Sequence, residues 1–158
     1  MSAILYPGTF DPPHLGHLHI IDRLAVLFER VEVAIGQDSE KKPPFFSLQE
    51  RKALLIPLVS HHKHVRVSTF ERLLIDHAKE LACSCLARSL CDLRDYAREK
   101  ELAFANKTMS GIETVFLLAD PPFQSIRASI LRDIAANGGS LTPFVPPSVA
   151  SAVQQKLS

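Results

Sequence analysis

The stretch over residues 5–17, LYPGTFDPPHLGH, constrains the fold of this 158-residue chain more than any other. The apolar residues 3–6 lead into a turn rich in proline and glycine, and an apolar periodic segment over 18–28 follows directly. This order predicts a strand, a tight loop and a helix N-terminus, which would direct backbone N–H groups and the positive end of the helix dipole at one point. His14 and His17, three residues apart on the first turn of the predicted helix, would face that point. The junction therefore predicts a phosphate-binding site.

Predicted strands and helices alternate along the rest of the chain. This alternation is typical of a doubly wound, Rossmann-like α/β fold, so we expect a single domain over 1–158 with a five-stranded parallel sheet and helices on both faces. Ligands of such folds bind beyond the carboxyl ends of the strands. The opening loop, a loop over 37–46, Arg88 and a loop over 119–127 all follow strands and should converge there. Further strands are expected at 31–35, 65–67, 84–88 and 114–118, and helices at 48–58, 73–81, 92–108, 126–136 and 148–157.

The overall charge of the chain is close to neutral, with 18 Lys and Arg against 17 Asp and Glu, a net charge of +1. Such a chain has no basic field to attract nucleic acid. No apolar run reaches the roughly 20 residues that a membrane-spanning helix needs. The N-terminus lacks a signal-peptide pattern, so we expect a cytoplasmic protein. His61, His62 and His64 lie between a predicted helix and a predicted strand, where a solvated turn is favoured over a metal site.

The words GTFDPPHLGH resemble the signature of a nucleotidyltransferase superfamily. Its hallmark is (His/Thr)-x-Gly-His after Gly-(Thr/Ser)-Phe-Asp, and its spacing and flanks are specific. Members join a nucleoside monophosphate to a phosphorylated acceptor and release pyrophosphate. The resemblance therefore implies an enzyme that binds two phosphorylated substrates at the opening loop.

Several later stretches resemble the bacterial phosphopantetheine adenylyltransferases in particular, and the resemblance runs nearly end to end. This chain has counterparts of six features of that family. They are its Lys-Lys-Pro motif, its Phe-(Thr/Ser)-Leu-x-Glu-Arg motif, its strand-four arginine, its charged fourth helix, its fifth strand and its last phosphate loop. These counterparts are Lys41-Lys42-Pro43, FSLQER over 46–51, LARSL over 86–90, Tyr96, Glu99 and Asn106, ETVFL over 113–117, and SIRASILR over 125–132.

The resemblance implies that the phosphate of 4′-phosphopantetheine attacks the α-phosphorus of ATP and gives dephospho-coenzyme A and pyrophosphate. The implied catalytic residues are His17, Lys41 and Arg88. Glu99 would contact the nucleotide, or would merely pair with a lysine on its own helix. Residues implied for ATP binding are Thr9, Phe10, His17, Ser89, Leu90, Cys91, Glu99, Gln124, Ser125, Ile126, Arg127, Ala128, Ser129 and Ile130, and those for the acceptor are Thr9, Lys41, Leu74 and Arg88.

The resemblance further implies Mg²⁺ carried by the ATP phosphates rather than by protein ligands, a homohexamer, and coenzyme A as a possible feedback ligand. The sequence departs from the family where a glycine is Ser89, a second arginine is Cys91, and two loop serines are Arg127 and Ala128. We hypothesise that Arg127 supplies the charge that Cys91 lacks.

Two alternatives stay open from the sequence. The form HLGH is closer to the nicotinate-nucleotide adenylyltransferases, although those enzymes are usually longer and lack the Lys-Lys-Pro and strand-four arginine words. The departures also fit a nucleotide-binding regulator that kept the fold and lost the reaction. His17, Lys41 and Arg88 argue against a regulator, because a protein that only binds nucleotide would not need that set.

Overall fold

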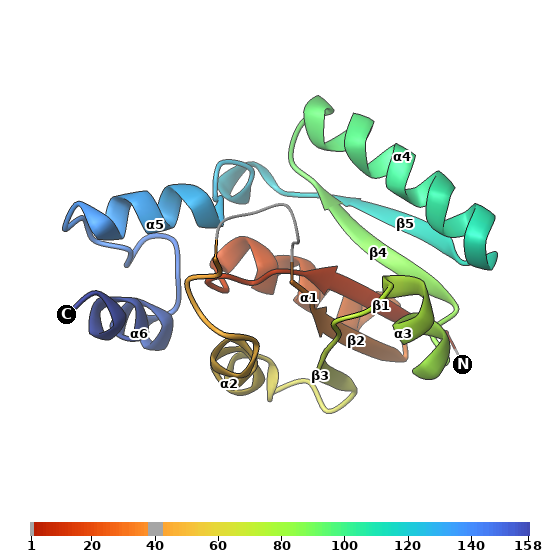
Figure 1. The fold of residues 1–158 in the computed structure, drawn as a ribbon, viewed down its shortest axis with the longest axis horizontal. Helices are drawn as coiled ribbons and strands as arrows, with labels where there is room; N and C mark the ends of the chain where they lie inside the picture. Colours follow the sequence, from red (N-terminus) through yellow and green to blue (C-terminus); the bar gives the residue numbers. More distant parts are fainter. Residues whose placement is uncertain (1, 38–42) are drawn as a thin grey trace.

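The fold is that of a computed structural model, which describes residues 2–37 and 43–158 (Figure 1). Five strands form one parallel sheet in the order β3-β2-β1-β4-β5. This confirms the predicted Rossmann-like α/β class, while the single domain over 1–158 stays a prediction. The elements are β1 (Ala3–Gly8), α1 (Leu15–Leu27), β2 (Arg30–Ile35), α2 (Leu48–Val59), β3 (Val65–Thr69), α3 (Leu74–Glu80), β4 (Cys85–Leu90), α4 (Leu93–Ser110), β5 (Glu113–Leu118), the 3₁₀ turn η1 (Pro121–Phe123), α5 (Ala128–Ala136) and α6 (Pro147–Leu157).

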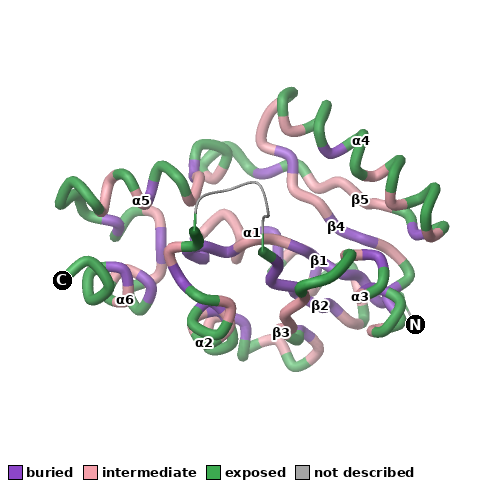
Figure 2. The backbone as a smooth tube through the Cα atoms, in the orientation of Figure 1, coloured by how far each residue is buried: buried purple, intermediate pink, exposed green. Residues whose placement is uncertain are grey.

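Helices cover both faces of the sheet, and the alternation of side chains along β1 shows how. Ile4 and Tyr6 belong to a core that includes residues of α1 and α2, whereas Ala3 and Leu5 belong to a core that includes Ala78 of α3. The central strands are therefore buried on both sides, as parallel strands usually are, while much of α4 is exposed and most of the edge strand β5 is only partly buried (Figure 2).

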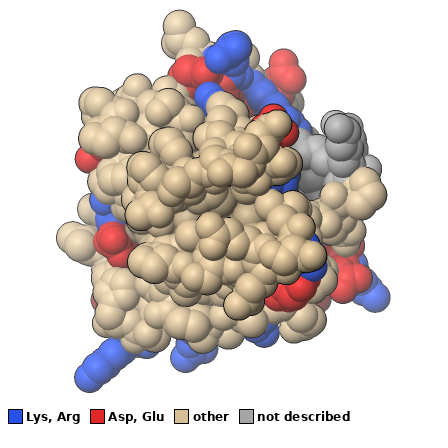
Figure 3. Space-filling model, turned by 90° about the vertical axis from the view of Figure 1, so that its left-hand side faces the viewer, with Lys and Arg blue, Asp and Glu red and all other residues tan. Residues whose placement is uncertain are grey.

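The two C-terminal helices, α5 and α6, pack through a third apolar cluster that is joined by Leu54 and Leu58 of α2 and by Leu15 of α1. The cluster attaches this helical pair to the start of α1, next to the predicted site. The face of the molecule that α5 and α6 form carries few charged side chains (Figure 3).

The order of the strands reverses between β1 and β4, which defines the switch point where ligands of such folds bind. The ladder between these strands pairs Ile4 with Cys85 and Leu5 with Leu86. Beyond it, Pro7 has no N–H to donate, and its carbonyl oxygen accepts a hydrogen bond of 3.0 Å from Nη1 of Arg88. The Arg88 side chain therefore lies where the sheet opens.

Among the described residues, none of the helices combines the length and the apolar character that a membrane span needs.

Candidate active site

The junction of β1 and α1 is closed by the two histidines that the sequence singles out. His14 is the N-cap of α1 and His17 is its third residue, so the two histidines flank the first turn of the helix, where the sequence predicted them. The backbone N–H of His14 donates to Nδ1 of His17 at 3.2 Å, and that of His17 donates to Nδ1 of His14 at 3.3 Å. This is a capping box made from two imidazoles, whose rings stack with centroids 3.5 Å apart.

The reciprocal hydrogen bonds fix the protonation of both rings. Because each Nδ1 accepts a backbone N–H, each neutral imidazole carries its proton on Nε2. Burial lowers the pKa of His14 to about 4. Burial also lowers the pKa of His17 well below its usual value, and the neighbouring His14 lowers it further. Near neutral pH both rings are therefore neutral hydrogen-bond donors through Nε2–H.

The turn before the histidines holds Phe10 beneath His17. Phe10 is fully buried with φ 49°, a conformation that is uncommon for residues other than glycine. Its ring centroid lies 4.7 Å from that of His17. Gly8 makes room for this ring, because a Cβ at Gly8 would meet Phe10 Cε2 at 2.8 Å.

Three further polar residues hold this turn, and sequence reasoning gave them no role. Asp11 accepts the backbone N–H groups of Phe45 and Phe46 at 2.7 and 2.8 Å, which ties the opening loop to the described end of the 37–46 loop. Arg51 is buried and donates to the carbonyl oxygens of Thr9 and Gly36 at 2.7 and 3.0 Å. Arg132 of α5 donates to the carbonyl oxygen of Asp11. Two of these residues could have been found from the sequence, because Asp11 lies in the motif FDPP and Arg51 lies in the motif FSLQER.

Arg88 of β4 and Glu99 of α4 form an ion pair on the β4 side of the switch point. Arg88 Nε and Nη2 donate to the two oxygens of the Glu99 carboxylate, each at 2.6 Å, and Glu99 is buried. Burial alone would lower the pKa of Arg88, but the bonds to Glu99 outweigh it and the pKa is raised. With Nη1 bonded to Pro7, these contacts use three of the five N–H groups of the guanidinium. The other two can still donate to a ligand.

Glu99 thus pairs with an arginine of β4 and not with a lysine of its own helix. Its predicted contact with the nucleotide stays a prediction, as do the other assigned roles.

The segment after β5 docks on the first turns of α1. The rings of His19 and Phe123 stack with centroids 4.4 Å apart, and His19 Nε2 lies 3.1 Å from a carboxylate oxygen of Asp120. Arg23 donates to the carbonyl oxygen of Leu118 at 2.6 Å. The segment leads into α5, which begins at Ala128 rather than at Ile126 and for which the described residues provide no side-chain cap. Its first-turn N–H groups are left to donate to another partner.

Arg127, the N-cap residue of α5, reaches the N-terminus of α4. Its Nη2 lies 3.1 Å from Asp92 Oδ2 and its Nη1 lies 3.6 Å from Asp95 Oδ1. Asp95 also accepts the backbone N–H of Cys91 at 3.0 Å, and burial raises the pKa of the Cys91 thiol. The cation of Arg127 therefore lies beside the uncharged Cys91, as the compensation hypothesis requires, but two carboxylates partner it.

The structure brings most of the predicted site residues to the carboxyl edge of the sheet. Ser89, Leu90 and Cys91 end and follow β4, and Leu74 opens α3 just after β3. Lys41 lies outside the described residues. The remaining predicted residues lie in the segment that precedes and opens α5: Gln124, Ser125, Ile126, Arg127, Ala128, Ser129 and Ile130.

The fold and this site define a class of protein. The model of the cytidylyltransferase-like family matches residues 5–134, which run from β1 into α5. The match covers the histidine pair, Arg88 and the start of α5. The chain is thus a cytidylyltransferase-like nucleotidyltransferase domain.

Curated relatives narrow the class. The chain is 35% identical to a phosphopantetheine adenylyltransferase of Finegoldia magna, over 99% of this chain and 97% of the relative. It is 40% identical to one of Thiobacillus denitrificans, over 99% of this chain and 98% of the relative. The chain therefore belongs to the phosphopantetheine adenylyltransferase family.

A likeness to a solved structure supports the fold. A Vibrio parahaemolyticus protein assigned as a nicotinate-nucleotide adenylyltransferase superposes with a TM-score of 0.67 over 97% of this chain and 99% of that one. Its sequence identity to this chain is 14%, so it bears on the fold alone. The sequence relatives favour the phosphopantetheine reading over the nicotinate-nucleotide alternative.

Proposed function

We propose that this protein transfers the adenylyl group of ATP to 4′-phosphopantetheine, giving dephospho-coenzyme A and pyrophosphate, a step of coenzyme A synthesis. The observation that carries this proposal is the pair of stacked, neutral histidines at the N-terminus of α1, facing the switch point of the sheet. Adenylyl transfer needs no covalent enzyme intermediate, so the protein must align two phosphates and stabilise the charge that develops between them.

The histidines suit the α-phosphate of ATP. A neutral Nε2–H donor at a helix N-terminus can strengthen its hydrogen bond as negative charge grows, without a proton having to move. His17 has its other nitrogen occupied by a backbone N–H, so its ring orientation is fixed before the substrate arrives. Phe10 and the stacked His14 hold the ring from two sides. His17 would thus donate to the α-phosphate.

Arg88 suits the acceptor phosphate. The ion pair with Glu99 and the bond to Pro7 fix its guanidinium at the opening of the sheet and leave two N–H groups, which matches the bidentate geometry of a phosphate. Lys41 would add a second cation from the loop that follows β2, and Thr9 and Leu74 would contact the acceptor.

The helix start at Ala128 suits the β- and γ-phosphates. Its first-turn N–H groups lack side-chain caps, and Arg127 brings a cation to the same place. Ser129, in the first turn, would donate its hydroxyl.

Mg²⁺ would accompany ATP and neutralise part of its phosphate charge. Two described carboxylates near the site are engaged, because Asp11 accepts two backbone N–H groups and Glu99 binds Arg88. That donor set fits an ion held by the phosphates and water, as Mg²⁺ is in many nucleotide sites. The homohexamer and the coenzyme A feedback that the resemblance implies, and the cytoplasmic location expected from the sequence, remain part of this proposal.

Substrate preference tests the proposal. Purified protein with Mg-ATP is expected to release pyrophosphate when 4′-phosphopantetheine is added and not when nicotinate mononucleotide is added. Release with nicotinate mononucleotide alone would transfer the assignment to the nicotinate-nucleotide enzymes. Binding of ATP without release with either acceptor would support the regulator.

A further inference from the structure

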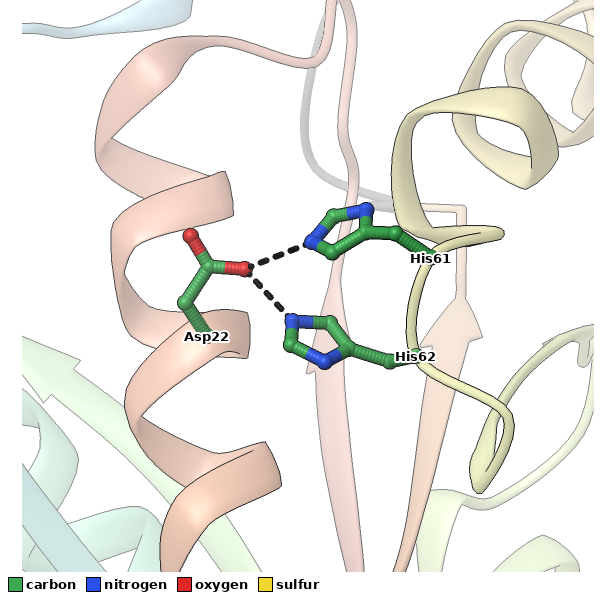
Figure 4. Close-up of side chains that lie close together, drawn as sticks. All are labelled: Asp22, His61 and His62. Carbon is green, nitrogen blue, oxygen red and sulfur yellow. Dashed lines mark hydrogen bonds and ion pairs between the residues drawn. The ribbon is translucent and has the colours of Figure 1, made fainter.

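Asp22, His61 and His62 come together where the turn that follows α2 lies beside α1 (Figure 4). Asp22 lies in α1, five residues after His17 and therefore about 7 to 8 Å further along the helix. His61 and His62 lie in the turn between α2 and β3. The three residues join two segments that are nearly forty positions apart in the sequence.

Both imidazoles point their Nε2 atoms at the same carboxylate oxygen. His62 Nε2 lies 2.8 Å from Asp22 Oδ1, and His61 Nε2 lies 3.4 Å from it. The three ligand atoms lie within 4.8 Å of one another. Atoms that bind one tetrahedral ion at about 2.0–2.1 Å are about 3.3–3.4 Å apart. The 3.4 Å separation of His61 from Asp22 already has this value, whereas the 2.8 Å separation of His62 must lengthen and the two imidazole nitrogens, which lie within 4.8 Å, can close on the ion by side-chain rotation.

The chemistry of the cluster points to a particular class of ion. Two imidazoles and one carboxylate suit Zn²⁺ and its neighbours Co²⁺, Ni²⁺ and Cu²⁺, whereas Mg²⁺ and Ca²⁺ prefer oxygen ligands throughout. The Nδ1 atoms of both rings are turned away from the carboxylate, so each ring can keep its proton there while Nε2 binds a metal (Figure 4). More than half of the side-chain surface of Asp22 and His61 is exposed, which leaves the fourth position to water.

We propose that Asp22, His61 and His62 form a site for a divalent transition-metal ion, and that Zn²⁺ is the ion that it binds. His64, which the sequence pattern groups with them, is not a ligand, because its Nε2 lies 2.8 Å from the carbonyl oxygen of Ala25. The bound ion cross-links α1 to the α2–β3 turn. It therefore stabilises the helix whose N-terminus carries His14 and His17, at a point away from the reacting phosphates.

Calorimetric titration of the chelator-treated full-length protein with ZnCl₂, without ATP, tests the site. Replacing a residue that only hydrogen-bonds to a metal ligand weakens metal binding about 10- to 100-fold. Loss of a ligand itself should cost at least as much, so Asp22→Asn, His61→Ala and His62→Ala should each weaken Zn²⁺ binding at least about 10-fold. Lys63→Ala changes an exposed side chain in the same turn and should leave the affinity unchanged. MgCl₂ should give no comparable binding.

A thermal scan supplies a second readout that also checks folding. Zn²⁺ at about 100 times its Kd should raise the Tm of the wild type by roughly 5–10 °C, and should not raise that of the His61→Ala/His62→Ala variant. The proposal is overturned if the wild type binds no Zn²⁺, or if the double variant binds it as tightly as the wild type. Because no substrate is present, neither result depends on the proposed adenylyl transfer.

Discussion

Replacement of Arg127 by serine, the residue that the family carries there, should weaken ATP binding and lower the stability of the fold only slightly. Arg127 pairs with Asp92 and Asp95, and the three side chains are 37%, 31% and 28% exposed. Ion pairs this exposed stabilise a protein by about 0–1 kcal/mol. A guanidinium that binds an ATP phosphate makes charge-assisted hydrogen bonds worth about 1.5–3 kcal/mol.

The net effect on ATP follows from these two magnitudes. Arg127 must leave its carboxylates to reach the phosphate, so the net contribution is about 0.5–3 kcal/mol, or about a 2- to 150-fold rise in the Kd for ATP on replacement. The free energy of unfolding should fall by at most about 1 kcal/mol. Adding Cys91→Arg to the variant should recover much of the lost affinity, and the double-mutant cycle measures the coupling.

Arg94→Ser is the matched control, because Arg94 also pairs with Asp92, at 3.0 Å, but is 90% exposed and lies outside the phosphate loop. Isothermal titration with a non-hydrolysable ATP analogue measures all four proteins. Equal affinities for the ATP analogue in the wild type, Arg127→Ser and Arg94→Ser would refute the hypothesis that Arg127 supplies the charge that Cys91 lacks. The role of Arg127 would then be limited to its ion pairs between α5 and α4.

Three further predictions concern the histidines and the acceptor cations. His17→Ala should lower kcat by about 10²–10³ with a small change in KM, and steady-state kinetics that show an unchanged kcat would remove His17 from the transition state. Lys41→Ala and Arg88→Ala should each weaken phosphopantetheine binding by about 1.5–3 kcal/mol, whereas intact affinity and turnover in either variant would make that residue structural. Because the folded pKa of His14 is about 4, below its unfolded value near 6.5, its stabilising effect is present above pH 6.5 and is lost as the pH falls towards 4. Between pH 6.5 and 4, urea unfolding should show that the free energy of unfolding of the wild type falls by about 3 kcal/mol more than that of His14→Thr. Parallel plots of this free energy against pH for the two proteins would contradict the assignment.

The sheet and its helices could be predicted from the sequence because their signals are local. Strands such as 31–35 and 114–118 are mostly apolar, and alternation with helices leaves few topologies for a parallel sheet. The start of α1 at the two histidines could be predicted from the loop before it, but the capping role of His14 could not, because histidine is not among the usual N-cap residues. An imidazole caps this helix only because a second imidazole returns the hydrogen bond.

The polar frame of the site could not be predicted, because its partners meet only in the folded chain. Glu99 stands eleven residues after Arg88, and nothing in the helical spacing shows that its carboxylate turns back to the end of β4. Arg51 and Asp11 reach backbone groups more than thirty positions away. Asp22 of α1 and His62 of the turn after α2 likewise come into contact only in the folded chain.

The central claim is that the α-phosphorus of ATP is transferred to phosphopantetheine, and the fate of a radioactive label tests it most directly. With ATP labelled at the α-phosphate, the account predicts that the label appears in dephospho-coenzyme A. With ATP labelled at the γ-phosphate, it predicts that the label appears in pyrophosphate. Label from the γ-phosphate in the acceptor, or α-label transferred to nicotinate mononucleotide but not to phosphopantetheine, would contradict it.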